Sequence, residues 1–173
     1  MKHTSENIQL SLAKIQVNSY PLRCLFSDKG LVYVGLQTDE DKPWKSLTQK
    51  FTIIESVDNI FSEKLHQQLS EYFSGERLSF NIPIDFLEAS DFQKSVWQSL
   101  LNIPFGTRVS YQAIAEMIGQ EMAYRAVATA IAVNPILIIC PCHRVIKKSG
   151  QIGNYRGGVG MKRTLLDFEA AHK

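Results

Sequence analysis

The sequence predicts an α/β N-terminal domain, a small antiparallel sheet plus a helix, followed by a mainly helical C-terminal domain with a helix-turn-helix. Apolar residues alternate in several early segments and recur at helical spacing later in the chain. Charge is the third observation. Residues 1–100 carry 10 Lys+Arg and 13 Asp+Glu, and residues 101–173 carry 9 and 4, so the net charges are −3 and +5 and sum to +2. We expect two domains, residues 1–88 and 89–173.

Composition limits the class of protein. The chain has 173 residues, 45% hydrophobic and 21% charged, which is typical of globular proteins. No apolar run reaches membrane-spanning length, and the N-terminus lacks the apolar core of a signal peptide, so we expect a cytoplasmic protein with no membrane contact. The basic second half is consistent with a polyanionic partner or with an ordinary solvated surface.

The N-terminal half is expected to be mostly strands. Residues 8–19 predict a strand, and residues 22–27 and 31–36 predict a hairpin that turns at Gly30. Residues 38–50 predict a loop or short helix, and residues 51–55 a further strand. Asp58 is a candidate N-cap for a helix that runs to about Phe73 and ends at Gly75. The apolar face of this helix would comprise Ile60, Phe61, Leu65, Leu69 and Phe73. An extended segment, residues 80–86, would then cross to the second half.

The second half predicts a helix pair after a first helix. Asp91 can cap a helix over residues 92–101, and Ser110 can cap a helix over residues 111–118 that ends at Gly119. A further helix follows from about residue 122 to 132, so the last two form a helix-turn-helix candidate. Its second helix is rich in alanine. Small side chains let a helix approach the minor groove of DNA, although tight packing against a neighbouring helix would favour them too. On the first interpretation Arg125 would reach the bases or the phosphates.

Cys142 is the candidate nucleophile. The thiolate is the reactive form of cysteine, and the adjacent His143 could take its proton if a third group held the imidazole. Glu169 is the candidate for that group, while Asp167 lies on a different face of the same predicted helix. A structural thiol is the alternative. A papain-like hydrolase would need its histidine far away in the sequence.

The other two cysteines are expected to be inert. Cys24, Cys140 and Cys142 are an odd, sparse set, which fits a reducing compartment. Cys140 and Cys142 would alternate in an extended segment and point to opposite sides, so we expect no disulfide between them.

Several spaced motifs between about residues 61 and 169 resemble the O6-alkylguanine-DNA alkyltransferases. They are Glu71-Tyr-Phe-Ser-Gly75, Phe92-Gln93, Val96-Trp97, Ile103-Pro-Phe-Gly106, Ser110-Tyr111-Gln112, Arg125-Ala-Val, Asn134-Pro135, Pro141-Cys-His-Arg-Val145, Gly153-Asn-Tyr-Arg-Gly-Gly158 and Leu165-Leu166 with Glu169. The resemblance implies that Cys142 accepts an alkyl group from O6-alkylguanine, and from O4-alkylthymine as a second candidate, irreversibly and once per molecule. It implies that His143 deprotonates Cys142 through a water and that Glu169 lies behind His143.

The resemblance also assigns the remaining site residues. Tyr111 would help to rotate the nucleotide out of the duplex and would protonate a guanine ring nitrogen, and Asn134 would be the hinge between the helix pair and the thiol. Arg125 would fill the gap left by the flipped base. The set expected to contact DNA is Arg125, Ala126, Ala128 and Thr129, and the set expected to hold the base is Val145, Tyr155 and Arg156.

The resemblance implies a monomer that binds the minor groove of double-stranded DNA without a cofactor. We expect no metal, because the N-terminal half offers only Cys24, His3 and His66. Arg156 stands where relatives often carry a smaller residue, and Ala128-Thr129 stand where glycines are common. Two alternatives remain for experiment. A non-catalytic relative that flags lesions would lack Cys142, and a helix-turn-helix regulator with an incidental thiol would ignore lesions.

Overall fold

A four-stranded sheet forms the first half of the protein. The computed structural model describes residues 7–56 and 59–173. The strands are β1 (Gln9–Val17), β2 (Tyr20–Phe26), β3 (Leu31–Leu36) and β4 (Thr52–Glu55), in the order β3-β2-β1-β4. The first three are antiparallel, as predicted, whereas β4 joins β1 in parallel.

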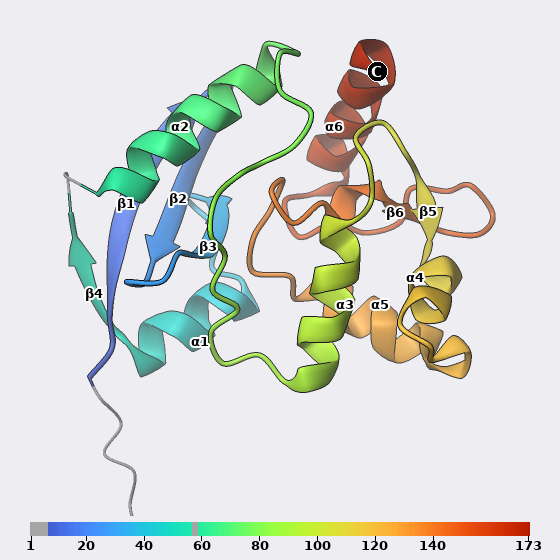
Figure 1. Cartoon of the computed structure of the whole chain (residues 1–173), viewed down its shortest axis with the longest axis horizontal. Coiled ribbons are helices and arrows are strands. Elements are labelled where there is room, and N and C mark those ends of the chain that lie inside the picture. Colours follow the sequence, from blue (N-terminus) through green and yellow to red (C-terminus); the bar gives the residue numbers. More distant parts are fainter. Residues whose placement is uncertain (1–6, 57–58) are drawn as a thin grey trace, which may run out of the picture.

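Two helices cover the sheet. Leu22 and Cys24 of β2 belong to the main core with residues of α2 (Ile60–Phe73), while Leu25 packs with Leu47 of α1 (Lys42–Lys50). Because successive side chains of a strand point to opposite faces, α1 and α2 lie on opposite sides of the sheet (Figure 1).

The cap and the apolar face of α2 differ from the prediction. Asp58 lies outside the described residues, and α2 is capped by Asn59, whose side chain accepts a hydrogen bond from the N–H of Phe61 at 2.8 Å. Ile60 is 77% exposed, because it is the first residue of the helix and has no turn beneath it to pack against.

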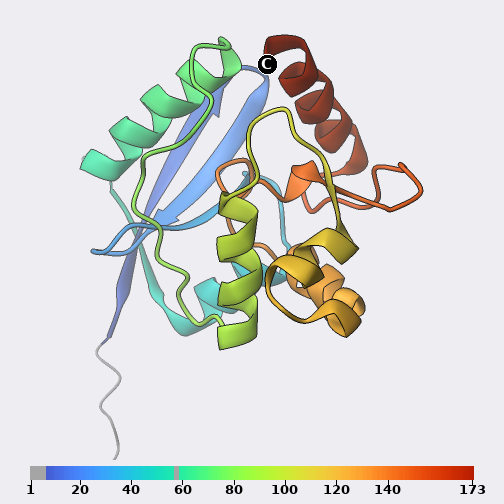
Figure 2. The same cartoon turned by 45° about the vertical axis from the view of Figure 1, so that its right-hand side comes forward.

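The second half is helical, and its α4 and α5 lie side by side (Figure 1 and Figure 2). It comprises α3 (Asp91–Leu101), β5 (Val109–Ser110), α4 (Tyr111–Met117), the 3₁₀ turn η1 (Glu121–Ala123), α5 (Tyr124–Ala132), the 3₁₀ turn η2 (Cys142–Arg144), β6 (Val145–Ile146) and α6 (Val159–His172). The helix-turn-helix prediction corresponds to α4, η1 and α5, and Ser110 caps α4 as expected.

Two predicted helix starts were wrong. Ser90, not Asp91, caps α3, because its hydroxyl accepts from the N–H of Gln93 while the Gln93 side chain accepts from the N–H of Ser90. The helix expected from residue 122 begins as η1 and becomes α-helical only at Tyr124.

The two halves meet along the outer edge of β3. Near its start, Leu31 exchanges backbone hydrogen bonds with Pro83 and Asp85 of the connecting segment. Near its end, the N–H of Val34 donates to the carbonyl of Pro135 at 2.9 Å, and its carbonyl accepts from Leu137 at 3.2 Å. The sheet edge is therefore covered, and it lies against the segment that leads to Cys142.

Candidate active site and DNA-binding face

Asn134 organises the chain around the thiol. Its side-chain amide Nδ2 donates to the backbone carbonyl of Cys140 at 2.9 Å and to Sγ of Cys142 at 3.0 Å. Its side-chain oxygen Oδ1 accepts from the backbone N–H of Ile136 at 3.0 Å. Asn134 is fully buried. Asn134 therefore fixes the position of the sulfur relative to the end of α5.

The segment before Cys142 is a tight turn and not the extended segment we predicted. Ile138 has a φ of 69°, which is unfavourable for a β-branched residue, and Cys142 opens the 3₁₀ turn η2. The prediction that Cys140 and Cys142 alternate in an extended segment was therefore wrong, and strand alternation does not separate the two thiols. Both thiols, and that of Cys24, are nevertheless free and buried.

His143 is held by Glu169 behind the thiol. Nε2 of His143 lies 2.7 Å from Oε1 of Glu169, and both side chains are almost fully buried. Because an ionised carboxylate only accepts hydrogen bonds, it favours the neutral ring with its proton on Nε2. Nδ1 of His143 is buried and has no partner among the described residues. This nitrogen is the free base of the site.

The carboxylate of Glu169 accepts hydrogen bonds from several residues besides His143. Tyr72 Oη donates at 2.8 Å, the backbone N–H of Gly106 at 3.1 Å, and Arg144 donates from Nε at 3.0 Å and from a terminal nitrogen at 2.9 Å. Burial raises the pKa of Glu169, but the bonds from His143 and Arg144 outweigh burial and hold that pKa well below its ordinary 4.5. The carboxylate thus stays ionised.

Sequence reasoning did not assign roles to Tyr72 or Arg144. Arg144 follows His143 directly, so its position was a usable signal. Tyr72 lies 97 residues before Glu169, and nothing in its local sequence indicates that contact.

The resting thiol and imidazole are both neutral. Burial raises the pKa of Cys142 above 9.0, although the Asn134 bond and the charges of Arg156 and Lys162 lower it in part. Burial lowers the pKa of His143 below 6.5, although Glu169 opposes the shift. The proton of Cys142 must therefore move when the sulfur reacts, and not before.

Lys162 is a further site residue that the sequence did not indicate. Its ammonium donates to the carbonyl of Val145 at 2.6 Å and to that of Asn154 at 3.2 Å, and burial lowers its pKa to about 8. The carbonyl of Val145, predicted to hold the base, therefore has one lone pair already in use.

A cavity of about 500 Å³ leads from α5 to the thiol. Its lining includes the buried Cys142 together with Tyr111 and Tyr155, and the exposed Tyr124 and Arg125 of α5. The hydroxyl of Tyr155 is buried without a partner among the described residues. The volume is sufficient for one nucleobase.

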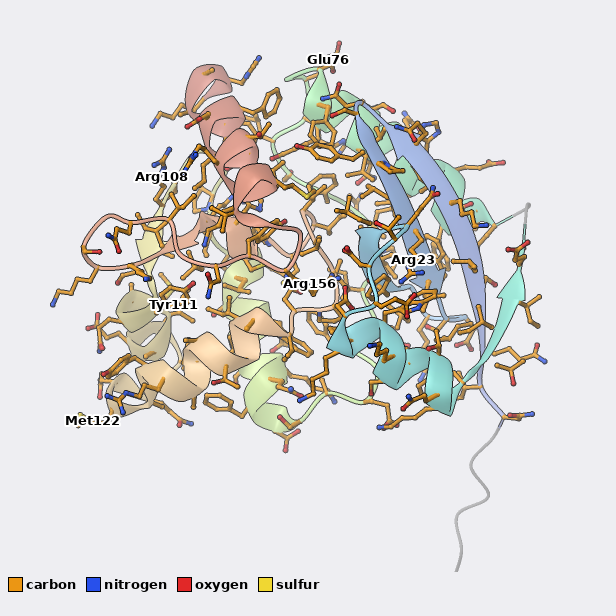
Figure 3. The ribbon with its side chains drawn as sticks, turned by 180° about the vertical axis from the view of Figure 1, so that it is seen from behind. Arg23, Glu76, Arg108, Tyr111, Met122 and Arg156 are labelled. Carbon is orange, nitrogen blue, oxygen red and sulfur yellow. The ribbon has the colours of Figure 1, made fainter. Side chains whose placement is uncertain are left out.

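Arg156 lines the same cavity, but its guanidinium is engaged elsewhere. It donates from Nε to the carbonyl of Asn134 at 2.8 Å and from its terminal nitrogens to Val34 and to Asp41 in the first half. Figure 3 shows it between the two halves. The side chain of Arg156 is therefore not free to bind a nucleobase in the cavity, whereas its backbone groups are.

The outer face of α5 carries the residues expected at DNA. Arg125, Ala126 and Thr129 are exposed, and Ala128 is half-buried. The hydroxyl of Thr129 donates to the carbonyl of Arg125 at 3.1 Å, so its hydrogen bond stays within the helix. Met122, 94% exposed, projects beyond this face (Figure 3).

Residues 7–56 and 59–173 offer neither a metal site of the usual kind nor a membrane-spanning helix. Neither a cluster of three or more His, Cys, Asp or Glu side chains able to hold a metal ion, nor a helix long and apolar enough to cross a membrane, occurs in this part of the chain.

A helix pair with small exposed residues on α5, and a cavity lined by the thiol that precedes the His143–Glu169 pair, are typical of a DNA-binding protein with a cysteine nucleophile. Family models agree. Residues 91–171 match "6-O-methylguanine DNA methyltransferase, DNA binding domain", and residues 22–86 match "6-O-methylguanine DNA methyltransferase, ribonuclease-like domain". The chain belongs to the 6-O-methylguanine DNA methyltransferase family.

Individual relatives agree with this assignment. The inducible methylated-DNA–protein-cysteine methyltransferase of Bacillus subtilis is 40% identical over 148 residues, which is 82% of this chain and 79% of the relative. A methylated-DNA–protein-cysteine methyltransferase of Mycobacterium tuberculosis is 50% identical over 102 residues, which is 59% of this chain and 61% of the relative. The crystal structure of Mycobacterium tuberculosis OGT in complex with DNA has a TM-score of 0.76 and 35% identity, over 95% of this chain and 94% of that one.

Proposed function

We propose that this protein repairs DNA by transferring an alkyl group from O6-alkylguanine in duplex DNA to Sγ of Cys142, once per molecule. O4-alkylthymine is proposed as a second substrate. The observation that carries the proposal is a buried Cys142 in the lining of a cavity that it shares with residues of α5, followed directly in the chain by His143, which Glu169 holds at 2.7 Å.

The proposed reaction is a displacement at the alkyl carbon. The thiol proton passes through a water to Nδ1 of His143, the unpaired nitrogen, while Glu169 stabilises the resulting imidazolium. Sγ forms a bond to the alkyl carbon as the bond from that carbon to guanine O6 breaks. Tyr111 donates its proton to a guanine ring nitrogen, so the base leaves neutral. The product is a stable thioether, which explains why each molecule would react once.

The proposed DNA contact uses the small residues of α5 in the minor groove. Ala126, Ala128 and Thr129 let the helix approach, and Arg125 occupies the gap left by the extruded nucleotide. Asn134 connects this helix to the thiol.

The extruded base would be held mainly by backbone groups. The N–H groups around Tyr155 and Arg156 would hold the base oxygen, and the carbonyls of Cys142 and Val145 would accept its exocyclic amine. This assignment is supported by the position of Cys142, Tyr155 and Arg156 in the lining of the cavity, and for Val145 only by its place directly after η2.

We further propose that the protein acts as a monomer in the cytoplasm, with domains at 1–88 and 89–173. The two family models, which end at residue 86 and begin at residue 91, support this boundary.

The test is mass spectrometry of the protein after incubation with duplex DNA that contains O6-methylguanine. One methyl group is expected on the peptide that contains Cys142, at no more than one per molecule, and none on Cys140. Intact DNA binding with an unmodified Cys142 would refute the proposal. Cys142→Ala serves as the control that should bind DNA and remain unmodified.

A further inference from the structure

Arg156 connects the loop over the cavity to the N-terminal half. Its guanidinium donates to Tyr33 Oη at 3.1 Å, to Asp41 Oδ2 at 2.5 Å and to the carbonyl of Val34 at 2.6 Å. Its Nε donates to the carbonyl of Asn134 at 2.8 Å, and its side chain is 5% exposed. One buried side chain thus joins the loop, the hinge before Cys142 and strand β3.

Asp41 is the anionic partner in this contact and is itself fixed. Its Oδ1 accepts from the N–H of Trp44 at 2.9 Å and so caps α1, while its Oδ2 accepts from Tyr33 Oη at 3.0 Å as well as from Arg156. Because one oxygen caps α1 and the other is bonded to Tyr33, the Asp41 carboxylate is fixed to the N-terminal half. Asp41 therefore holds Arg156 at a defined place.

The chain leaves space for the guanidinium at Gly35. A Cβ added to Gly35 would come within 2.9 Å of a terminal nitrogen of Arg156 and still closer to the Tyr33 hydroxyl. Since real Cβ atoms do not make such contacts, a side chain at this position would require the Tyr33 hydroxyl, the arginine or both to move. Gly35 is thus an independent sign that β3 is shaped around Arg156.

The loop has a second anchor at Asn154, two residues before Arg156. Lys162 donates to the carbonyl of Asn154, which also lines the cavity, at 3.2 Å. Asn154 and Tyr155 thus lie between an anchor within the C-terminal half and an anchor to the N-terminal half. If the Arg156 anchor is released, the loop is free to open from that side while Lys162 keeps it attached.

We infer that Asp41 is a positioning residue for the reaction: through Arg156 it holds the loop of residues 151–158 closed and thereby restricts the size of the alkyl group that reaches Cys142. The inference rests on the proposed alkyl transfer. It gives the N-terminal domain a part in substrate selection, although none of the described residues of that domain lines the cavity.

The experiment compares Asp41→Asn with the wild type. Asparagine also caps helices, so α1 should persist while the charge that holds Arg156 is removed. Hydrogen exchange in peptides covering residues 151–158 should become about tenfold faster, because a charge-assisted bond is weakened. Single-turnover transfer from O6-methylguanine duplex should slow, and transfer from a free guanine base with an aromatic O6 substituent should slow less or accelerate.

Two further variants sharpen the comparison. Arg156→Gln should reproduce both effects, and the double variant should show little more than either single change, because both act on one contact. Glu88→Gln is the matched control, since it removes an exposed ion pair to Lys50 at the other end of α1. It should change neither exchange nor the ratio of the two transfer rates.

The outcomes are distinct. Unchanged exchange over residues 151–158 in Asp41→Asn, or a proportional loss of both transfer rates, would overturn the inference. If the wild type accepts no alkyl group at all, the proposed function fails and size selection fails with it. The exchange comparison would then still decide whether Asp41 holds the loop.

Discussion

The inner end of the cavity and its mouth are built in opposite ways. At the inner end, Asn134, Cys142, His143 and Glu169 are buried, and Glu169 accepts bonds from four different residues. At the mouth, Arg125 and its neighbours on α5 are exposed and bond mainly within their own helix. The inner end is preorganised for chemistry, whereas the mouth is completed only by a partner. Changes at the inner end should act without DNA, and changes at the mouth only with it.

Glu169→Gln should have the largest effect. It leaves the buried charge of Arg144 without its carboxylate, so we expect the free energy of unfolding to fall by about 3–5 kcal/mol. The imidazolium also loses its stabilising partner, so Cys142 should react roughly tenfold or more slowly with a small alkylating probe. Chemical denaturation and probe kinetics measure the two effects.

Asp167→Asn is the control for that variant. Asp167 lies on the same helix, and its only ion pair among the described residues is an exposed contact with Arg108 at 3.9 Å. Such pairs contribute about 0–1 kcal/mol, so stability and probe reactivity should hardly change. A similar loss in both variants would remove Glu169 from its assigned role.

Lowering the pH should reduce the stability of the protein, because the Glu169 carboxylate becomes protonated. The pKa of Glu169 in the folded protein lies below its ordinary 4.5, so its contribution to stability is complete above that pH and is lost as the pH falls further. The difference in Tm between the wild type and Glu169→Gln should therefore shrink as the pH is lowered from about 7 to about 3. A constant difference would contradict the assigned shift.

Local patterns predicted most elements and indicated candidates for the reacting residues. Strand alternation located β1 to β3, and helical spacing with a capping serine located α4. The adjacency of Cys142 and His143 indicated the nucleophile directly. The predictions of these elements were confirmed because their physical cause lies within a few residues of sequence, whereas the role of Cys142 stays a prediction.

Contacts between distant segments could not be predicted in this way. Tyr72 reaches Glu169, Lys162 reaches Val145, and Arg156 reaches Asp41 only because the two halves and the loop pack together. The same reason explains the errors. Nothing local shows that the segment before Cys142 turns at Ile138, since Asn134 holds that turn through its side chain.

Arg125→Ala tests whether the exposed residues at the mouth of the cavity act only when duplex DNA is bound. Arg125 is exposed, so the free energy of unfolding should stay within about 0.5 kcal/mol. Transfer from duplex DNA should slow roughly tenfold to a hundredfold, because extrusion of a nucleotide costs a few kcal/mol that the arginine helps to offset. Transfer from the free modified base should be unchanged. Arg163→Ala removes the same charge from an exposed position on α6 and is the control. Equal losses with both substrates would reject the role of Arg125.

Tyr72→Phe should give the smallest effect. It distinguishes a Tyr72 that shifts the pKa of His143 through Glu169 from a Tyr72 that only packs in the core. It removes one of several donors to Glu169, so the free energy of unfolding should fall by about 1 kcal/mol. A carboxylate with fewer donors stabilises the His143 imidazolium more strongly and raises the pKa of His143. Because the neutral imidazole is the base, the acid limb of the rate profile for Cys142 alkylation should move to higher pH. Tyr20→Phe, which removes a hydroxyl with no hydrogen-bond partner among the described residues, should leave the profile in place. An unshifted profile in Tyr72→Phe would reduce Tyr72 to a packing role, and the tuning of the inner end would then depend on Arg144 and Gly106 alone.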